Sequence, residues 1–205
     1  MAARAVALAL KEESIDPSTE IWRLSVDHYH AMIAAGILDE GDNLELLEGW
    51  LVKKMTKTRD HSLATWLTRE ALKRVVGTSW YVDSQEPVTT ADSEPEPDVS
   101  VVRAELRRNR RHHPGPEDVA LVVEVADSSL RRDRTWKKRL YAAAKIPTYW
   151  IINLKAAQIE VYTQPTTRRG KTDYLKRKDY AAGEKVPLVI GNRIVARLAV
   201  RDLLP

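Results

Sequence analysis

The chain has no cysteine among its 205 residues, which excludes disulfide bonds and metal sites built from thiolates. Long apolar runs are also missing, because no stretch approaches the roughly 20 residues that a helix needs to span a bilayer. The N-terminal segment VALALKEE is too short and too quickly acidic to serve as a signal peptide. Together these absences favour a cytoplasmic protein that makes no membrane contact.

Apolar residues are plentiful enough to form a core, and the surface is highly charged. Hydrophobic residues make up 43% of the chain and charged residues 30%, which is typical of a soluble globular protein. We expect a loosely held extension over residues 1–20 and a single domain over residues 21–205, because no internal repeat or long linker divides the chain.

The order of helical and strand patterns predicts an α/β domain. Helical spacing with capping residues marks three segments: 26–35, 61–76 and 133–145. Strand patterns mark the other apolar segments: 44–47, 50–55, 80–88, 97–102, 120–125, 148–154, 158–164 and a short one in the tail. The strand–helix–strand order over residues 120–154 implies a parallel crossover, whereas hairpins imply antiparallel pairs. We therefore expect a mixed sheet flanked by helices.

Several large apolar side chains are expected to be buried. The helix over residues 61–76 has an apolar stripe made of Leu63, Leu67, Leu72, Val75 and Val76. Five tryptophans fall in periodic apolar patterns: Trp22, Trp66, Trp80, Trp136 and Trp150. We interpret these tryptophans as core or interface residues and not as base-stacking platforms.

Two acidic residues lie at the edges of consecutive predicted strands. Asp98 starts the strand PDVSVV, and Glu124 lies 26 residues later near the end of ALVVEV. If these strands are neighbours, both carboxylates can point at one spot. A carboxylate buried alone costs several kcal/mol, so it needs a cation, a donor network or a metal. Oxygen ligands favour Mg²⁺ or Mn²⁺, while the structural alternative is a carboxylate satisfied by backbone donors or an arginine.

Lys137 lies on the helix that follows Glu124. It is four residues from Asp133 and four from Tyr141, so the three side chains share one side of that helix. Lys137 could lean over the strand end and hold an attacking water. On spacing alone, a surface ion pair with Asp133 is the better-supported alternative.

A set of segments across nearly the whole chain forms a specific combined pattern. These segments are LELLEGWLV at 44–52, His61 opening a helix, SEPEPDVSVV at 93–102, HHPGPEDVALVVEVADSS at 112–129, D-R-x-x-K-x-x-L-Y-A at 133–142, IPTYWIINL at 146–154 and IEVY at 159–162. In this pattern the chain resembles the Uma-type restriction endonucleases, a branch of the PD-(D/E)XK nuclease superfamily, over about residues 20–204.

The resemblance implies a restriction-endonuclease-like fold, a divalent metal and a nucleic-acid substrate. By motif matching, Asp98 takes the PD aspartate position and Glu124 the (D/E) position. The lysine of the E-x-K motif would fall at residue 126, which is Ala126 here. Lys137 on the next helix is the natural replacement for that lysine.

Two further residues are candidates for the same site. Glu48, in the stretch ELLEG, is either a third acidic partner of the metal or a turn residue before Gly49. His61 is either a substrate contact or proton carrier, or an ordinary residue at the N-terminus of its helix.

Basic residues cluster on both sides of the acidic pair along the sequence. One cluster includes Arg107, Arg108, Arg110 and Arg111, and the other includes Arg132 and Lys138. Arginine forks suit phosphate oxygens, and several such contacts give salt-sensitive binding. The alternative is a solvated face, and no sequence-reading motif accompanies the clusters.

The sequence therefore predicts a Mg²⁺- or Mn²⁺-dependent endonuclease that hydrolyses phosphodiester bonds in DNA and forms a homodimer. Asp98 and Glu124 would hold the ion, Glu48 would help them, and Lys137 would position the water. A nuclease fold that binds nucleic acid without cutting it, or an oligomeric interaction protein with structural acids, is the alternative.

Overall fold

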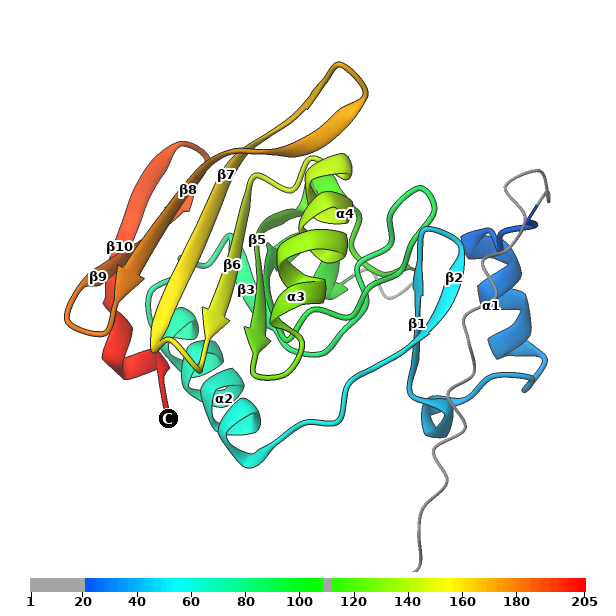
Figure 1. The fold of residues 1–205 in the computed structure, drawn as a ribbon, viewed down its shortest axis with the longest axis horizontal. Coiled ribbons are helices and arrows are strands. Elements are labelled where there is room, and N and C mark those ends of the chain that lie inside the picture. The colour runs from blue at the N-terminus through cyan, green and yellow to red at the C-terminus, as the bar shows by residue number, and fades with distance from the viewer. Residues whose placement is uncertain (1–20, 109–111) are drawn as a thin grey trace, which may run out of the picture.

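A six-stranded sheet forms the centre of the computed structural model, which describes residues 21–108 and 112–205. Its strands lie in the order β3-β4-β5-β6-β7-β8 (Figure 1). Their bounds are β3 (Trp80–Asp83), β4 (Val99–Arg103), β5 (Val119–Ala126), β6 (Thr148–Asn153), β7 (Gln158–Arg168) and β8 (Lys171–Ala181). Neighbouring strands run antiparallel except β5 and β6, which run parallel. The expected α/β fold with a mixed sheet and a parallel crossover is confirmed.

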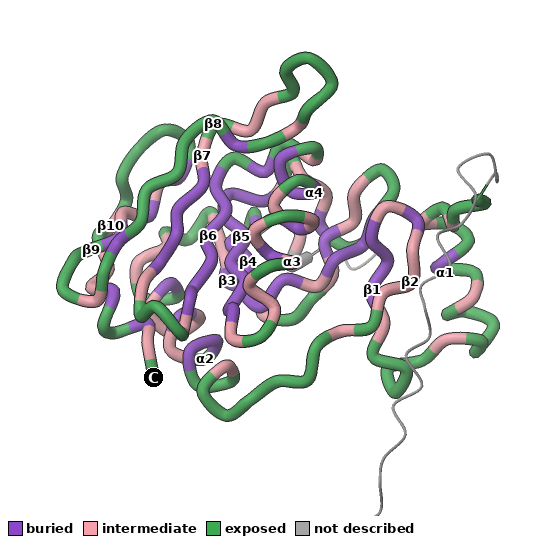
Figure 2. Tube along the Cα trace, viewed as in Figure 1, coloured by how far each residue is buried: buried purple, intermediate pink, exposed green. Residues whose placement is uncertain are grey.

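Strand β5 lies at the centre of the sheet, and all of its residues are buried. Figure 2 shows the buried backbone concentrated in these central strands. Because side chains alternate along a strand, Val123 and Val125 enter the core cluster on one face, while Val122 and Ala126 enter the cluster on the other. By the same alternation Glu124 points to the second face.

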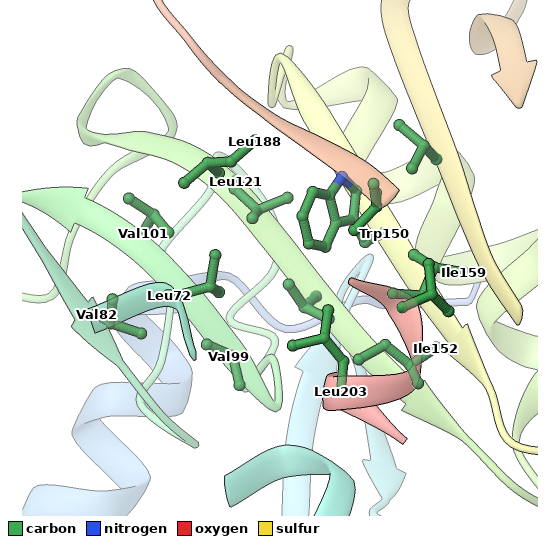
Figure 3. Packing of buried hydrophobic residues seen from close by; sticks show 14 of the residues in the cluster. Leu72, Val82, Val99, Val101, Leu121, Trp150, Ile152, Ile159, Leu188 and Leu203 are labelled. Carbon is green, nitrogen blue, oxygen red and sulfur yellow. The ribbon is translucent and has the colours of Figure 1, made fainter. Parts of the chain in front are cut away.

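The first face of the sheet is covered by α2 (Arg59–Lys73) and by the C-terminal hairpin of β9 (Lys185–Ile190) and β10 (Arg193–Ala199). The chain ends in the short helix η5 (Val200–Leu203). Leu72 of α2 and Leu203 of η5 lie in the same cluster as Trp150 and Ile152 of the sheet (Figure 3). This cluster packs α2 against the sheet.

The second face is covered by one helical segment between β5 and β6. It consists of α3 (Leu130–Arg132), a wide π-helical turn (Asp133–Lys137) and α4 (Lys138–Ala143). Four tyrosine rings pack beneath it, from Tyr141, Tyr149, Tyr162 and Tyr174. Asp133 and Lys137, at the two ends of the wide turn, are both buried.

The N-terminal part is a separate layer beside the sheet (Figure 1). It contains α1 (Val26–Ala34), the short helix η1 (Glu40–Asp42) and the hairpin of β1 (Leu44–Leu47) and β2 (Trp50–Lys53). Two further short helices, η2 (Ala104–Arg108) and η3 (Pro116–Asp118), lie between β4 and β5. The hairpin joins the rest of the domain at Leu46, which bridges to Glu94.

Two sequence expectations about helices need correction. The helix expected over 133–145 begins at Leu130 and contains the wide turn, which ordinary helical periodicity does not reveal. The stripe expected on the helix at 61–76 is also partly wrong, because Leu63 is 41% exposed. Leu72 of the expected stripe is fully buried, and the other buried residues of α2 are the smaller Ala64, Thr65 and Thr68, which allow close approach to the sheet.

The tryptophans divide between core and surface. Trp150 is fully buried, whereas Trp22 and Trp66 are 72% and 55% exposed and do not belong to the core. An interface role for the exposed tryptophans stays a prediction. Within the described ranges, no helix has the length and apolar character needed to cross a membrane.

Candidate active site

Asp98 and Glu124 meet at one end of the β4–β5 pair. The antiparallel register places Val99 opposite Val123. Asp98, the residue before β4, therefore lies beside the residues that follow Val123 in β5. Both carboxylates line a small cavity of about 60 Å³, together with Lys137 and His61. The convergence expected from the sequence is therefore present.

Asp98 is held by one backbone donor and one histidine. The Val125 amide donates a hydrogen bond of 2.8 Å to Asp98 Oδ2, and His61 Nε2 lies 3.1 Å from the same oxygen. His61 reaches this position because Thr58 caps α2 and accepts the His61 amide hydrogen bond. His61 Nδ1 is buried and has no partner within the described part of the chain.

Glu124 accepts two hydrogen bonds from the helical segment above it. Lys137 Nζ donates to Oε1 at 2.9 Å, and the Tyr141 hydroxyl donates to the same oxygen at 2.7 Å. Burial raises the pKa of the Glu124 carboxyl, the Lys137 ammonium opposes that rise, and the Asp98 charge adds to it. Neither donor is an arginine. The arginine partner that the sequence suggested as a structural alternative for this carboxylate is replaced by Lys137 and Tyr141.

Lys137 is buried among carboxylates and does not form the surface pair with Asp133 considered from sequence. Besides Glu124, its Nζ lies 3.2 Å from Glu45 Oε2. Burial acts to lower the pKa of Lys137, but the charges of Glu124, Glu45 and Asp133 outweigh burial and raise it. Lys137 is therefore an ammonium, which can donate hydrogen bonds and stabilise negative charge but cannot accept a proton.

Glu45 is the site residue that the sequence reasoning missed. It lies in β1, is 1% exposed and lines the same cavity. Its Oε1 is buried and finds no hydrogen-bond partner among the described residues. A charged residue inside the apolar run LELL was the available signal, since burying an unpaired carboxylate there is costly.

Glu48, expected as a third metal partner, is directed elsewhere. Its Oε2 accepts hydrogen bonds from Trp136 Nε1 at 2.9 Å and from Arg139 at 2.7 Å. It does not line the cavity. Glu48 occupies the turn of the hairpin, with φ of 48°, so the turn-residue interpretation describes its position and Glu45 provides the third carboxylate.

Asp133, in the helical segment, and Ser129, just before it, also line the cavity. The Ser129 hydroxyl donates to Asp133 Oδ2 at 2.5 Å. Burial raises the pKa of the Asp133 carboxyl, while Lys137 and the Ser129 hydrogen bond oppose that rise. Asp133 is thus a buried acid near the candidate site and not a solvent-exposed partner of Lys137.

The basic residues that flank the two acids in the sequence do not all lie near them in the structure. Arg132 lines the cavity. Lys138 points away from it and forms an ion pair of 2.9 Å with Asp173. The basic loop leaves β4 at Arg103, at the end of the strand opposite to Asp98, because sequence neighbours separate along an extended strand.

The side chains of four arginines of that loop lie outside the described part of the structure. Arg107 and Arg108 contribute the end of η2, of which the structure describes the backbone. Arg110 and Arg111 lie outside the described residues. Their expected binding of nucleic acid stays a prediction.

The oxygen donors of the cavity fit a magnesium ion. Magnesium usually keeps several waters and is bound through one or two carboxylates, and Asp98 and Glu124 supply two on one cavity. The unpartnered Glu45 Oε1 adds a buried oxygen nearby. Within residues 21–108 and 112–205, no three or more histidine, aspartate or glutamate side chains form a ready-made metal site, so water would complete the coordination.

Comparison with known structures identifies a similar fold. A crystal structure described as "a putative nuclease belonging to DUF820 from Anabaena variabilis ATCC 29413" superposes with a TM-score of 0.66 at 16% identity, covering 88% of this chain and 97% of that one. NucC of E. coli MS115-1 in its apo form gives a TM-score of 0.30 at 14% identity, covering 56% and 48%, which is too low to bear on the fold.

The family comparison extends over most of the domain. Among curated proteins, none matches the sequence. The sequence model of the Uma2 family, described as "Putative restriction endonuclease", matches residues 26–190. That range includes both strand-end acids, Lys137 and the β1–β2 hairpin. The chain therefore belongs to the Uma2 family.

Proposed function

We propose that this protein is a divalent-metal-dependent endonuclease that hydrolyses phosphodiester bonds in DNA. The observation that carries the proposal is the cavity in which Asp98, Glu124 and Lys137 converge. Two carboxylates and one ammonium on a shared cavity are what metal-assisted phosphoryl chemistry requires. Membership of the Uma2 family supports the same reaction class.

Asp98 and Glu124 are the residues that would hold Mg²⁺ or Mn²⁺. When bound there, the ion would lower the pKa of a water and stabilise negative charge on the phosphate. The Val125 amide and His61 fix the orientation of Asp98, and Tyr141 fixes that of Glu124. Both ligands are thereby preorganised by groups from β5, α2 and α4.

Lys137 would act as a fixed positive charge beside the reacting phosphate. As an ammonium held by Glu124 and Glu45, it can donate a hydrogen bond to the attacking water or to a phosphate oxygen. This role needs no proton transfer by the lysine. Its position on the helix supplies the charge that Ala126 cannot.

Arg132 would bind the phosphate backbone next to the cavity. Its Nη1 donates to the Lys53 carbonyl at 3.2 Å, which directs the guanidinium toward the cavity wall. The Nε atom is buried and has no partner among the described residues. The guanidinium lines the cavity, and arginine forks commonly bind phosphate oxygens.

Cleavage assays with substituted carboxylates test this function. Purified protein is incubated with plasmid, linear duplex, single-stranded DNA and RNA, in Mg²⁺, Mn²⁺ or EDTA. We expect cleavage of DNA with either metal and none in EDTA. Asp98→Asn and Glu124→Gln should each reduce cleavage by about a hundredfold or more, as removing one charge-stabilising group does in other enzymes.

The matched control is Asp202→Asn, because Asp202 is 67% exposed and lies far along the chain in η5. It should cut at the wild-type rate. Wild-type cleavage by folded Asp98→Asn or Glu124→Gln would overturn the assignment.

A nuclease fold that binds DNA without cutting it is the second candidate. The observation in its favour is that Lys137 already compensates Glu124 and Glu45 without any metal. Salt-sensitive binding of DNA with no cleavage in either metal would establish it. Cleavage that disappears with Glu124→Gln would reject it.

A homodimer is also part of the proposal, because restriction-like nucleases often use two active sites to cut both strands of a duplex. Sedimentation velocity with and without duplex DNA tests the assembly. A monomer in both conditions would contradict it.

A further inference from the structure

A second hollow lies beside the cavity and shares part of its wall. This side hollow has a volume of about 320 Å³. Met55, Ser128, Ser129 and Arg132 line both spaces. The shared wall puts the side hollow within reach of a chain-like ligand whose phosphate sits at the cavity.

The walls of the side hollow include one aromatic ring and one thioether. Trp136 and Met55 both line it, and Met55 is 47% exposed. The indole is held by its edge, because Nε1 donates to Glu48 Oε2 and Arg139 binds the same carboxylate. This anchoring gives Glu48 a structural purpose and leaves the ring in one orientation.

Positive charge accompanies these apolar walls. Arg131 and Arg132 both line the side hollow. Aromatic and thioether groups favour flat, polarisable rings, while guanidinium groups favour phosphates. A nucleotide combines a flat ring with a phosphate, so its chemistry matches both features.

We propose that the side hollow binds one unpaired nucleobase, stacked on Trp136, next to the phosphate at the cavity, which revises the sequence expectation that this tryptophan is not a base-stacking platform. The base would come from a single strand or from a locally opened duplex, because a paired base has both faces covered by its neighbours. A volume of about 320 Å³ is at the small end of sites for small ligands. The inference deepens the proposed nuclease function by naming the form of its substrate.

Binding measurements without metal test the base site separately from cleavage. Fluorescence anisotropy compares a labelled single strand with an abasic strand of equal phosphate number, both in EDTA. Wild-type protein should bind the strand with bases about tenfold more tightly, in line with the stacking of one base on an aromatic ring. Trp136→Ala should remove that preference and leave the affinity for the abasic strand unchanged.

Three further variants keep the test decisive. Trp136→Phe should retain most of the preference, and Trp66→Ala, which alters a tryptophan on α2 that is 55% exposed, should retain all of it. Met55→Ala should weaken the preference for the strand with bases while leaving the Trp136–Glu48 hydrogen bond in place. This variant replaces Trp136→Ala in the test if circular dichroism shows that Trp136→Ala does not fold.

Two results would overturn the base site. One is equal binding of both strands by the wild type, and the other is a folded Trp136→Ala that weakens both strands equally. A base preference without any cleavage in Mg²⁺ or Mn²⁺ would instead support the base site and reject the proposed catalysis, so the two failures are distinguishable.

Discussion

Three carboxylates, from Glu45, Glu124 and Asp133, raise the pKa of the buried Lys137 ammonium. Two of them lie within 3.2 Å of its Nζ. Without that ammonium, Glu45 and Glu124 would be buried like charges with no compensating cation. Removing one partner of a buried ion pair is costly for this reason.

Lys137→Met should therefore destabilise the protein by about 3–5 kcal/mol, measured as the free energy of unfolding in urea at neutral pH. Lys138→Met is the matched control, because Lys138 pairs with Asp173, which is 53% exposed, and exposed pairs contribute at most about 1 kcal/mol. Equal losses of unfolding free energy in the two variants would show that the charge of Lys137 contributes no more to stability than that of Lys138. Adding Glu45→Gln to Lys137→Met should restore part of the stability.

Another buried carboxylate, Glu160, lies on the same face of the sheet as Glu124 but outside the cavity. It accepts hydrogen bonds from Arg134, Asn153 and Tyr162. Burial acts to raise its pKa, but these donors and the Arg177 charge outweigh burial and lower the pKa from 4.5 to about 2. Folding therefore favours the ionised form of Glu160.

The resulting stability depends on pH in a defined direction. It is fully present above the unfolded pKa of 4.5 and is lost as the pH falls toward the folded pKa of about 2, a total of roughly 3 kcal/mol. Glu160→Gln should flatten the unfolding free energy between these pH values, measured by urea titrations across the acid range. A variant with the wild-type acid slope would assign that slope to other carboxylates.

At the residue scale, the acids at strand ends were predictable and their partners were not. Asp98 and Glu124 stand out because a charge interrupts or borders an apolar strand. Glu45 and Tyr141 reach Lys137 and Glu124 through folding of distant segments. Spacing along one helix favoured a surface pair for Lys137, since it contains no information about what covers that helix.

The β1–β2 hairpin is the element that brings Glu45 to the cavity. Its turn uses Glu48 and Gly49 with φ of 48° and 79°, a left-handed conformation that glycine adopts most easily. A Cβ at residue 49 would lie 2.5 Å from Arg23 Cβ and 3.0 Å from the Leu24 carbonyl oxygen. The turn therefore requires glycine for both its conformation and its surroundings.

Gly49→Ala should destabilise the protein by about 1–3 kcal/mol and reduce cleavage by displacing Glu45. Thermal unfolding and a DNA cleavage assay measure the two effects. Gly183→Ala is the control, because nothing lies within 4 Å of its added Cβ, and it should stay within about 0.5 kcal/mol of the wild type. A neutral Gly49→Ala would mean that the hairpin tolerates a rearranged turn.

At the element scale, strands were easier to predict than the helical segment over the site. The alternation in LELLEGWLV and the apolar run of β5 indicate strands directly. The wide turn at Asp133–Lys137 escaped prediction because a segment of five residues contains too few apolar positions for their spacing to reveal a change in helical pitch. Helix α2 buries Ala64 and Thr68, which a search for large apolar residues passes over.

Across the whole molecule, cationic side chains gather at the cavity while the basic loop begins at the other end of β4. Lys57 and Arg132 line the cavity, and Arg131 lines the side hollow. With about three phosphate contacts, raising the salt from about 50 to about 200 mM should weaken DNA binding roughly 20- to 40-fold. Anisotropy titrations in EDTA measure this, and a flat salt response would exclude a phosphate-binding role for this surface.

The overall architecture followed from the sequence because its strand–helix–strand order implies a parallel crossover. The attachment of the N-terminal layer could not be predicted from the sequence, because this attachment depends on contacts between segments far apart in the chain. Leu46 pairs with Glu94, and the Gly49 amide donates to the Asp92 carbonyl at 3.0 Å. These contacts determine which acidic residue of ELLEG enters the cavity.

That attachment has a consequence for how the protein responds to heat. The hairpin forms its own two-stranded sheet, but its Leu47 lies in the core cluster on the second face of the six-stranded sheet. Glu45 and Glu48 also pair with Lys137 and Arg139 of the helical segment. Parts that share one packed core open together. On warming, Glu45 should therefore leave the cavity only when that core opens, so DNA cleavage and the central sheet should be lost at the same temperature.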